Sequence, residues 1–204
     1  MTTKLIFIRH GQTNWNKERR YCGSLDVPLS KEGKLQAAKL KGKFTADAFD
    51  KIYASPRKRA MQTARVVFGN AARIIKVKGM CEINFGILEG MRHKEMLKKH
   101  PSVYKKWLKD PFNNHIPKAE RLAAFKKRVV GTIAKLIKQN SGKTIAIFCH
   151  GGSIAVFISH IKGKKDFWKY IPKSASVTVV AHARGKLAIK QFSRHTNRVK
   201  KGSL

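Results

Sequence analysis

The sequence predicts an α/β fold, a three-layer α/β/α sandwich around a mostly parallel sheet. Short apolar runs typical of buried strands alternate with amphipathic segments typical of helices along almost the whole chain. Two of the apolar runs, 5–8 and 144–148, are followed closely by a histidine and a glycine. Only three residues, 183–185, separate the last two expected strands. So short a connection favours a hairpin, and we therefore expect one antiparallel edge strand.

The expected strands are the six apolar runs Lys4–Ile8, Lys51–Ala54, Arg73–Lys76, Thr144–Phe148, Ser176–His182 and Leu187–Phe192. Four longer helices are expected: from the N-cap Ser30 to about Phe44, from Ser55–Pro56 to about Phe68, from Ala119 to Asn140, and from Gly151–Gly152 to about Ile161. Serine is a favoured N-cap, and proline fits the first helical turn. In the third helix, apolar residues recur at three- and four-residue steps.

The chain length of 204 residues and the 42% hydrophobic content favour a single domain, expected over residues 1–195. Residues 91–117 are less regular and contain two prolines, so we expect short helices that form a cap, or lid, over the carboxyl edge of the sheet. Residues 196–204 form a basic tail, expected to be disordered or an expression remnant.

The charge balance is strongly basic. Lys and Arg number 45 against 11 Asp and Glu, which gives a formal net charge of +34. The lysines are spread over nearly every amphipathic segment, whereas a dedicated nucleic-acid binder usually concentrates them in one patch or tail. We therefore expect non-specific attraction to polyanions such as nucleic acids, without a recognition motif.

Several classes of protein are excluded by composition. No apolar stretch approaches the roughly 18 residues of a membrane-spanning helix, and the amino terminus lacks a signal-peptide pattern. The three cysteines, Cys22, Cys81 and Cys149, have neither the spacing of a zinc site nor that of a disulfide framework. A reducing, cytoplasmic setting is expected. The oligomeric state has no signature in the sequence.

The segment Arg9-His10-Gly11-Gln12-Thr13 directly follows the first expected strand. In open α/β sheets, ligand sites lie at the carboxyl ends of strands. Imidazole is a nucleophile that can attack phosphorus, and guanidinium offers donors that match phosphate oxygens. This segment therefore predicts phosphoryl chemistry at a histidine.

Three further segments extend this prediction. Residues 144–152 repeat the pattern of an apolar strand, a histidine and a glycine that opens a helix. Residues 53–64 form a strand-to-helix junction that carries arginines, and residues 81–90 form a glycine-bounded loop that carries carboxylates. Because parallel strands end at one sheet edge, we expect the histidines of the first two segments to converge on one ligand.

Together these segments resemble the histidine phosphatase superfamily, which has the phosphoglycerate-mutase-like fold. The resemblance runs from Lys4 to about Phe192, and residues 20–30 and 82–86 look most like the alpha-ribazole phosphatases of cobalamin biosynthesis. It implies a metal-independent phosphomonoester hydrolase that forms a phosphohistidine, acts on a phosphorylated small molecule and needs no cofactor.

By the same resemblance, His10 would be the nucleophile. Arg9 and Arg59 would bind the phosphoryl oxygens, beside His150 as the second histidine of the phosphate pocket. Glu82 would be the general acid for the leaving alkoxide and then the base that activates water. Such an acid requires a raised pKa, and the nucleophilic imidazole must be neutral.

Expected substrate-binding residues are Asn16, Gly11, Gln12, Thr13, Gly23 and Gly151, and no metal ligand is expected. Several of the assignments have alternatives: His10 is alternatively a surface turn histidine, and His150 a satisfied strand-end histidine. Arg57 competes with Arg59, Glu89 is the substitute for Glu82, and Asn16 alternatively stabilises a turn.

The chain departs from the family pattern at two places. Where relatives carry Pro-Gly-Gly-Glu-Ser in a loop that faces the phosphate pocket, residues 117–121 read Pro-Lys-Ala-Glu-Arg. These bulkier groups are expected to narrow or redirect the substrate entrance. Ala155 stands where an arginine is common. Both departures bear on substrate specificity and on whether turnover is retained.

Asp26, Glu82, Glu89 and Glu120 lie in recognisable motifs. By contrast, helix surfaces that normally mix positive and negative charges carry almost only lysine. We therefore hypothesise a redesigned, positively supercharged variant of a natural phosphatase, because self-repulsion disfavours such a surface. Two alternative functions remain open. One is phosphoryl transfer of the phosphoglycerate-mutase type, although the modest span between Glu82 and His150 leaves less lid than mutases carry. The other is a scaffold that binds polyanions without turnover.

Overall fold

The protein is described by a computed structural model that covers residues 1–164 and 167–193. Six strands form one sheet in the order β3-β2-β4-β1-β5-β6. The strands are β1 (Thr3–Arg9), β2 (Lys51–Ala54), β3 (Ile74–Lys76), β4 (Thr144–Cys149), β5 (Val177–Ala183) and β6 (Lys186–Phe192). Every expected strand is present, with ends that differ from the expected ones by no more than one residue.

The predicted fold class is confirmed, because β3, β2, β4 and β1 pair in parallel. The reversed strand is β5, which pairs antiparallel with both β1 and β6. It lies one position inside the sheet edge, since β6 folds back onto its outer side. The turn of this hairpin contains Arg184 and Gly185, both with positive φ, as a tight two-residue turn requires.

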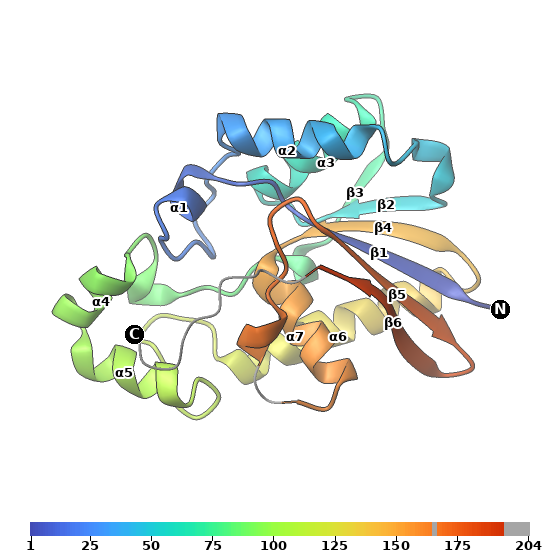
Figure 1. The fold of residues 1–204 in the computed structure, drawn as a ribbon. Coiled ribbons are helices and arrows are strands. Elements are labelled where there is room, and N and C mark those ends of the chain that lie inside the picture. Colours follow the sequence, from blue (N-terminus) through green and yellow to red (C-terminus); the bar gives the residue numbers. More distant parts are fainter. Residues whose placement is uncertain (165–166, 194–204) are drawn as a thin grey trace.

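Helices cover both faces of the sheet. α2 (Lys31–Lys41) and α3 (Lys58–Phe68) lie on one face, and α6 (Leu122–Gln139) and α7 (Gly151–Ile161) lie on the other (Figure 1). Among the residues that the structure describes, no helix has the length and apolar character needed to span a membrane.

Local chemistry sets where the helices begin. Ser30 caps α2 as expected, with its hydroxyl accepting a hydrogen bond from the Gly33 N–H at 3.0 Å. The expected start of α3 at Ser55–Pro56 is wrong: Arg57 occupies the N-cap position and the helix begins at Lys58. A short helix that the sequence analysis did not anticipate, α1 (Asn14–Lys17), follows the first histidine segment.

The core confirms the apolar periodicity of the longest helix. Leu122, Phe125, Val129, Ile133 and Leu136 are all buried against the sheet side of α6. Burial of one such side chain contributes about 1.5–3 kcal/mol to folding. The central strand β4 is buried on both faces, which explains why its sequence is continuously apolar rather than alternating.

The expected cap region contains α4 (His93–Lys99) and α5 (Pro101–Lys109), which lie beside the carboxyl ends of β1 and β4 (Figure 1). Pro101 occupies the first turn of α5, where its missing N–H is not needed. The cap has an apolar cluster of its own, which includes the buried Tyr104 and Trp107. The expected tail at 196–204 lies outside the described residues.

Residues 117–121 form the loop before α6, and the expected helix start at Ala119 is wrong by three residues. Lys118 has a φ of +60°, a left-handed conformation that glycine adopts more readily. Arg121 occupies the N-cap position with extended backbone angles, but its side chain makes no capping hydrogen bond.

Arg121→Ser is expected to raise the free energy of unfolding by about 1 kcal/mol, because serine can accept a hydrogen bond from the first turn of α6. Urea unfolding would measure the change. Arg121→Ala is the matched control, since it removes the same charge without supplying a hydroxyl. Equal stability of the two variants would contradict the capping argument.

Candidate active site

The register of the sheet brings the two strand-end histidines together. β1 and β4 run side by side in parallel, with Arg9 opposite Cys149, so the next residue of each strand lies at the same edge. The ring centroids of His10 and His150 are 5.2 Å apart, and the ring planes meet at 63°. Both side chains are buried, with exposed fractions of 4% and 0%.

The hydrogen bonds of His10 fix its tautomer. Its Nδ1 lies 2.7 Å from the carbonyl oxygen of Gly11, which can only accept, so Nδ1 carries the proton. Nε2 then keeps its lone pair. Burial, and next the charges of Arg59 and Arg9, hold the pKa of His10 well below its usual value. His10 is therefore a neutral imidazole with a free nucleophilic nitrogen.

His150 is held at both ring nitrogens. Arg59 Nε donates to its Nδ1 at 3.2 Å, so Nε2 carries the proton and donates to Ser55 Oγ at 2.8 Å. Burial lowers the pKa of His150 well below its usual value, and the charge of Arg59 lowers it further. In this arrangement His150 orients Arg59 and has no nitrogen left for another ligand.

Arg59 is fully buried and tied to the loop before α2. It donates to the carbonyl oxygens of Leu25 at 2.9 Å and Gly23 at 2.8 Å, with a longer contact of 3.4 Å to that of Cys22. Together with the bond to His150, these contacts engage most of its five N–H groups, so Arg59 holds the loop as well as the site. The competing candidate, Arg57, is partly buried, like Arg9, and its Nε is also buried without a hydrogen-bond partner among the described residues.

Arg9 has an unused donor. Its Nη1 donates to the carbonyl oxygen of Pro172. Its Nε is buried and has no hydrogen-bond partner within 1–164 and 167–193. A buried unpaired N–H is costly, so this atom has an unmet need for an acceptor.

Glu82 lies at the N-terminus of α7. Its Oε2 accepts from the Gly152 N–H at 2.8 Å, and its Oε1 accepts from its neighbour Ile83 at 3.0 Å. Burial raises the pKa of Glu82, although these two N–H groups oppose the shift. Gly152 is required here, since a Cβ on it would collide with the carboxylate.

The alternative acid, Glu89, is committed to structure. Its two oxygens accept from the backbone N–H groups of Gly23, Ser24 and Phe85 at 2.7–3.0 Å. It also accepts from the Ser24 hydroxyl at 3.1 Å. A carboxylate with four donors clamps the loop rather than delivering a proton.

Three of the expected substrate-binding residues are occupied by contacts within the chain. The Gly11 N–H donates to Thr63 Oγ1 at 3.1 Å, and a Cβ at this position would collide with the Gly33 carbonyl of α2. Thr13 is fully buried and caps α1 through its hydroxyl. The Gly23 N–H is taken by Glu89. These residues shape the site through their packing.

Other expected residues border open space. Arg9, Gln12, Asn16, Glu82 and Gly151 line a pocket of about 410 Å³. Asn16 accepts a hydrogen bond from the Thr13 N–H through Oδ1, so the turn-stabilising role is present in the structure.

Aromatic side chains form part of the lining of this pocket, whereas neither His10 nor His150 is among its lining residues. They are Tyr21, Phe85, Trp107, Phe167 and Trp168, called the aromatic wall below. Ring centroids are 4.8 Å apart for Tyr21 and Phe85, and 5.2 Å apart for Trp107 and Trp168. The rings of each pair meet nearly at right angles, so the wall gives the pocket an apolar surface of ring faces and edges beside its charged residues.

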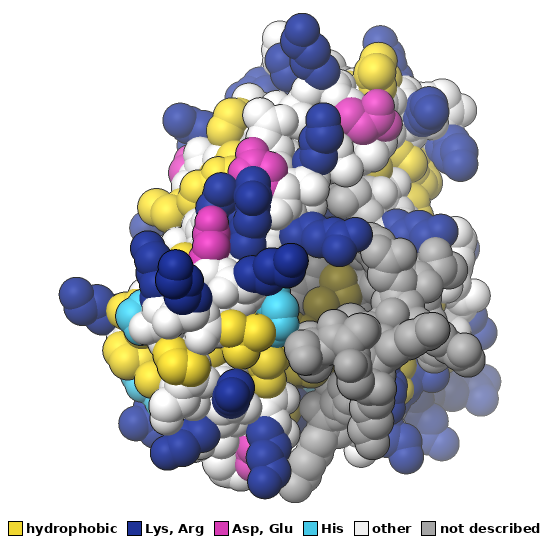
Figure 2. All heavy atoms as spheres, turned by 60° about the vertical axis from the view of Figure 1, so that its left-hand side comes forward, with side chains coloured by type: hydrophobic (Ala, Val, Ile, Leu, Met, Phe, Trp, Pro, Cys, Tyr) yellow, Lys and Arg dark blue, Asp and Glu magenta, His cyan; other side chains and the backbone are white. Residues whose placement is uncertain are grey.

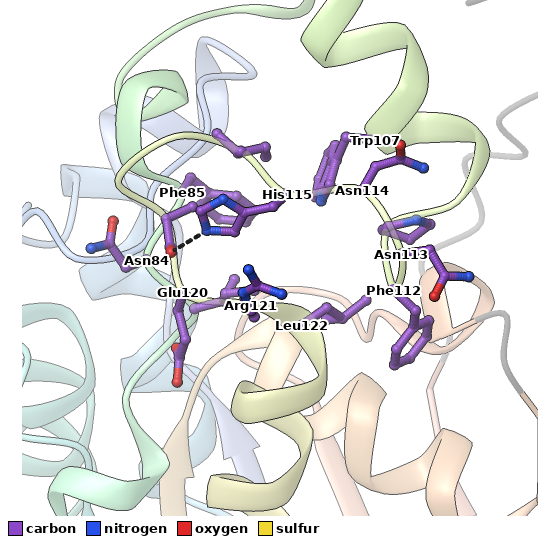
Figure 3. Close-up of a pocket in the computed structure, with 14 residues that line it drawn as sticks. Asn84, Phe85, Trp107, Phe112, Asn113, Asn114, His115, Glu120, Arg121 and Leu122 are labelled. Atoms are coloured by element: carbon purple, nitrogen blue, oxygen red, sulfur yellow. Dashed lines mark hydrogen bonds between the residues drawn. The ribbon is translucent and has the colours of Figure 1, made fainter.

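The expectation that residues 117–121 face the phosphate pocket is wrong. Ala119, Glu120 and Arg121 instead line a neighbouring cavity of only about 20 Å³, between the cap and α6 (Figure 3). His115 closes this cavity through a 3.1 Å contact with the Ala119 carbonyl oxygen (Figure 3). The loop turns away because Gly86 packs directly on its backbone.

The same loop supports Glu82 indirectly. Glu120 accepts two hydrogen bonds from Arg128, at 2.9 and 2.7 Å. Arg128 also donates to the carbonyl oxygens of Gly79 at 2.9 Å and Cys81 at 3.0 Å, immediately before Glu82. We call these contacts the Arg128 clasp.

Ser55 and Arg128 are positioning residues that the sequence patterns do not indicate. Ser55 was assigned to a helix start, although it is the partner of His150. Arg128 lies within the long helix, where one more basic residue carries no signal in so basic a chain. In a sequence, such a positioning role is indicated only where a polar residue occupies a position that the apolar periodicity predicts to be buried.

The surface around the pocket is basic. Lys and Arg side chains are spread over this face, with few Asp or Glu among them (Figure 2). All four ion pairs found in the described part of the chain join arginine to glutamate. No group of three or more His, Cys, Asp or Glu residues that could hold a metal ion occurs among the described residues.

Comparison with known proteins places this site in a family. Residues 5–195 match the family described as "Histidine phosphatase superfamily (branch 1)". The chain is 31% identical to "Phosphoserine phosphatase 1" of Hydrogenobacter thermophilus over 180 residues, which cover 87% of this chain and 85% of that protein. It is 30% identical to "Adenosylcobalamin/alpha-ribazole phosphatase" of Escherichia coli over 164 residues, 78% of this chain and 79% of the relative.

The solved structure of the alpha-ribazole phosphatase from Shigella flexneri superposes with a TM-score of 0.84 at 25% identity. The match covers 93% of this chain and 96% of that chain. The family match and the structural match therefore cover the same part of the chain, which includes both strand-end histidines. The chain belongs to the histidine phosphatase superfamily, and its enzyme class is phosphatase.

Proposed function

We propose that the protein hydrolyses phosphomonoesters through a phosphohistidine at His10 and needs no metal for this step. One observation carries the proposal: a buried, neutral His10 keeps a free Nε2 close to the buried Arg59 and to the partly buried Arg9, whose Nε is unpaired. A nucleophilic nitrogen beside preorganised cations is what phosphoryl transfer requires.

The proposed reaction has two steps. In the first, His10 Nε2 attacks phosphorus, the P–N bond forms, the bond to the alcohol oxygen breaks, and Glu82 gives its proton to that oxygen. In the second, Glu82 takes a proton from water, whose oxygen attacks phosphorus as the P–N bond breaks. Arg9 and Arg59 offset the charge on the phosphoryl oxygens in both steps.

The aromatic wall supports a finer proposal about the substrate. A planar ring on the alcohol part would bury apolar area and stack on this surface, which small polar alcohols cannot do. Alpha-ribazole 5′-phosphate carries such a ring, and two of the proteins to which the chain is similar are named for alpha-ribazole. We therefore propose a substrate of this type.

Two alternatives are distinguished by experiment. A mutase would retain the phosphoryl group and require a bisphosphate primer, whereas a hydrolase releases free phosphate without one. A supercharged scaffold would bind polyanions without turnover, and the unneutralised lysines of the surface support this binding as an additional property (Figure 2).

His10→Ala is expected to abolish release of inorganic phosphate, by about a thousandfold or more, because the nucleophile is lost. The acid-labile phosphoprotein that the wild type forms during turnover should also disappear. Binding of a fluorescent RNA oligonucleotide, measured by anisotropy, should persist and weaken with salt. His160→Ala, at an exposed position, is the control. Retained phosphate release in His10→Ala would refute the mechanism.

Glu82→Gln is expected to slow hydrolysis of alkyl phosphates by about 100- to 1,000-fold, and of 4-nitrophenyl phosphate by less than about tenfold. The reason is that a nitrophenolate leaves without a proton. Glu32→Gln, on the exposed face of α2, is the control of equal charge change. Equal losses on both substrates would argue against Glu82 as the acid.

The same assignment fixes the pH profile of the wild type. His10 must be unprotonated, so activity falls at low pH only as the pH drops through its lowered pKa. Glu82 must be protonated, so activity falls at high pH as the pH rises through its raised pKa. Only the high-pH limb should vanish in Glu82→Gln.

A panel of substrates tests the aromatic wall. We expect kcat/KM to be higher for alpha-ribazole 5′-phosphate than for 3-phosphoglycerate or phosphoserine. Each aromatic ring of the wall that contacts the substrate ring should contribute a factor of about two to ten. Trp168→Leu should narrow the difference without changing the rate on phosphoserine. A preference for the two small acids in the wild type would count against a ring-bearing substrate.

A further inference from the structure

Arg19 is an arginine that combines an unfavourable backbone conformation with a position at the pocket. Its φ is +56°, in the left-handed region where glycine and asparagine are favoured. Within the described part of the chain, the other non-glycine residues with positive φ are Lys118, Ala175 and Arg184. Of these four residues, only Arg19 borders the pocket of about 410 Å³.

The guanidinium of Arg19 is available to a ligand. The residue is exposed, and its side chain makes no ion pair with residues 1–164 and 167–193. The adjacent carboxylate, Glu18, is occupied by Arg20 at 2.6 Å and by Arg92 at 3.3 Å. The charge of Arg19 is therefore not neutralised by its nearest acid.

Arg20 contrasts with Arg19, although both border the pocket. Arg20 donates to the Gly90 carbonyl oxygen at 2.7 Å and to Glu95 at 3.2 Å, in addition to Glu18. These contacts tie α1 to the first turn of α4. Arg20 is thus a structural residue, whereas Arg19 is a second cation at the pocket beside Arg9.

We infer that Arg19 forms a second anion subsite, which favours phosphomonoesters whose alcohol part carries a carboxylate or another anionic group. The inference rests on the proposed function, because it concerns the specificity of that same pocket. Residues in strained conformations cluster at ligand sites, and Arg19 combines such strain with an unpaired cation at the pocket. The aromatic wall would hold the ring while Arg19 binds an acidic substituent on it.

The test uses two nearly isosteric substrates, 4-carboxyphenyl phosphate and 4-carbamoylphenyl phosphate, which differ in one negative charge. We expect the wild type to favour the carboxylate in kcat/KM, and Arg19→Asn to reduce that preference about fivefold through KM. Asparagine suits the left-handed backbone, so this variant removes the charge without straining the loop. Arg19→Lys should keep most of the preference, and added salt should weaken it in the wild type.

Arg184→Asn is the matched control. Arg184 has a φ of +50° in the hairpin between β5 and β6, so the substitution makes the same change in charge and backbone context away from the pocket. The wild-type preference should be intact in this variant. An equal fall in both variants would indicate long-range attraction only and would overturn the subsite, as would an unchanged preference in Arg19→Asn.

Failure of the proposed function has a different signature. If the wild type hydrolyses neither compound, the phosphatase mechanism is wrong, whatever Arg19 does. Calorimetric binding of the two phosphates to His10→Ala, and to His10→Ala combined with Arg19→Asn, then decides the subsite. A preference for the carboxylate that the second variant loses supports it, and equal affinities overturn it.

Discussion

The parallel pairing of β1 with β4 is the constraint on which the site depends. It places the residues that follow Arg9 and Cys149 at one sheet edge, and these residues are His10 and His150. A shift of one residue would exchange the faces on which side chains lie and separate the two rings. The buried apolar positions of both strands prevent such a shift, so the hydrophobic core fixes the geometry of the chemistry.

Burial then determines the charge states in the site. Both imidazoles are kept neutral by desolvation and by the arginines beside them, while the same desolvation favours the protonated form of Glu82. Backbone carbonyls accept hydrogen bonds from both arginines: Arg59 is bonded to the loop at 22–25, and Arg9 to Pro172. In the site, backbone carbonyls thus hold the cationic Arg9 and Arg59 beside groups whose uncharged forms burial favours, namely the two imidazoles and Glu82.

The sheet and the approach of the two histidines could be predicted from sequence, because apolar runs followed by His-Gly are local signals. The roles of Ser55 and Arg128 could not, since each depends on a partner more than forty residues away in the chain. The same limit applies to the loop at 117–121, whose direction is set by packing on Gly86 rather than by its own residues. Gly11 and Thr13 are expected from sequence to bind substrate, but their atoms are engaged by Thr63 and α1.

The Arg128 clasp has a mechanical consequence. Because one guanidinium joins the loop ahead of α6 to the peptide just before Glu82, the two cannot move independently. A rearrangement of the cap that moved Glu120 would be transmitted through the Arg128 guanidinium to Glu82, the proposed proton donor. Changes in sequence between α5 and α6 would therefore alter how fast the enzyme works, even at positions that never meet the molecule being cleaved.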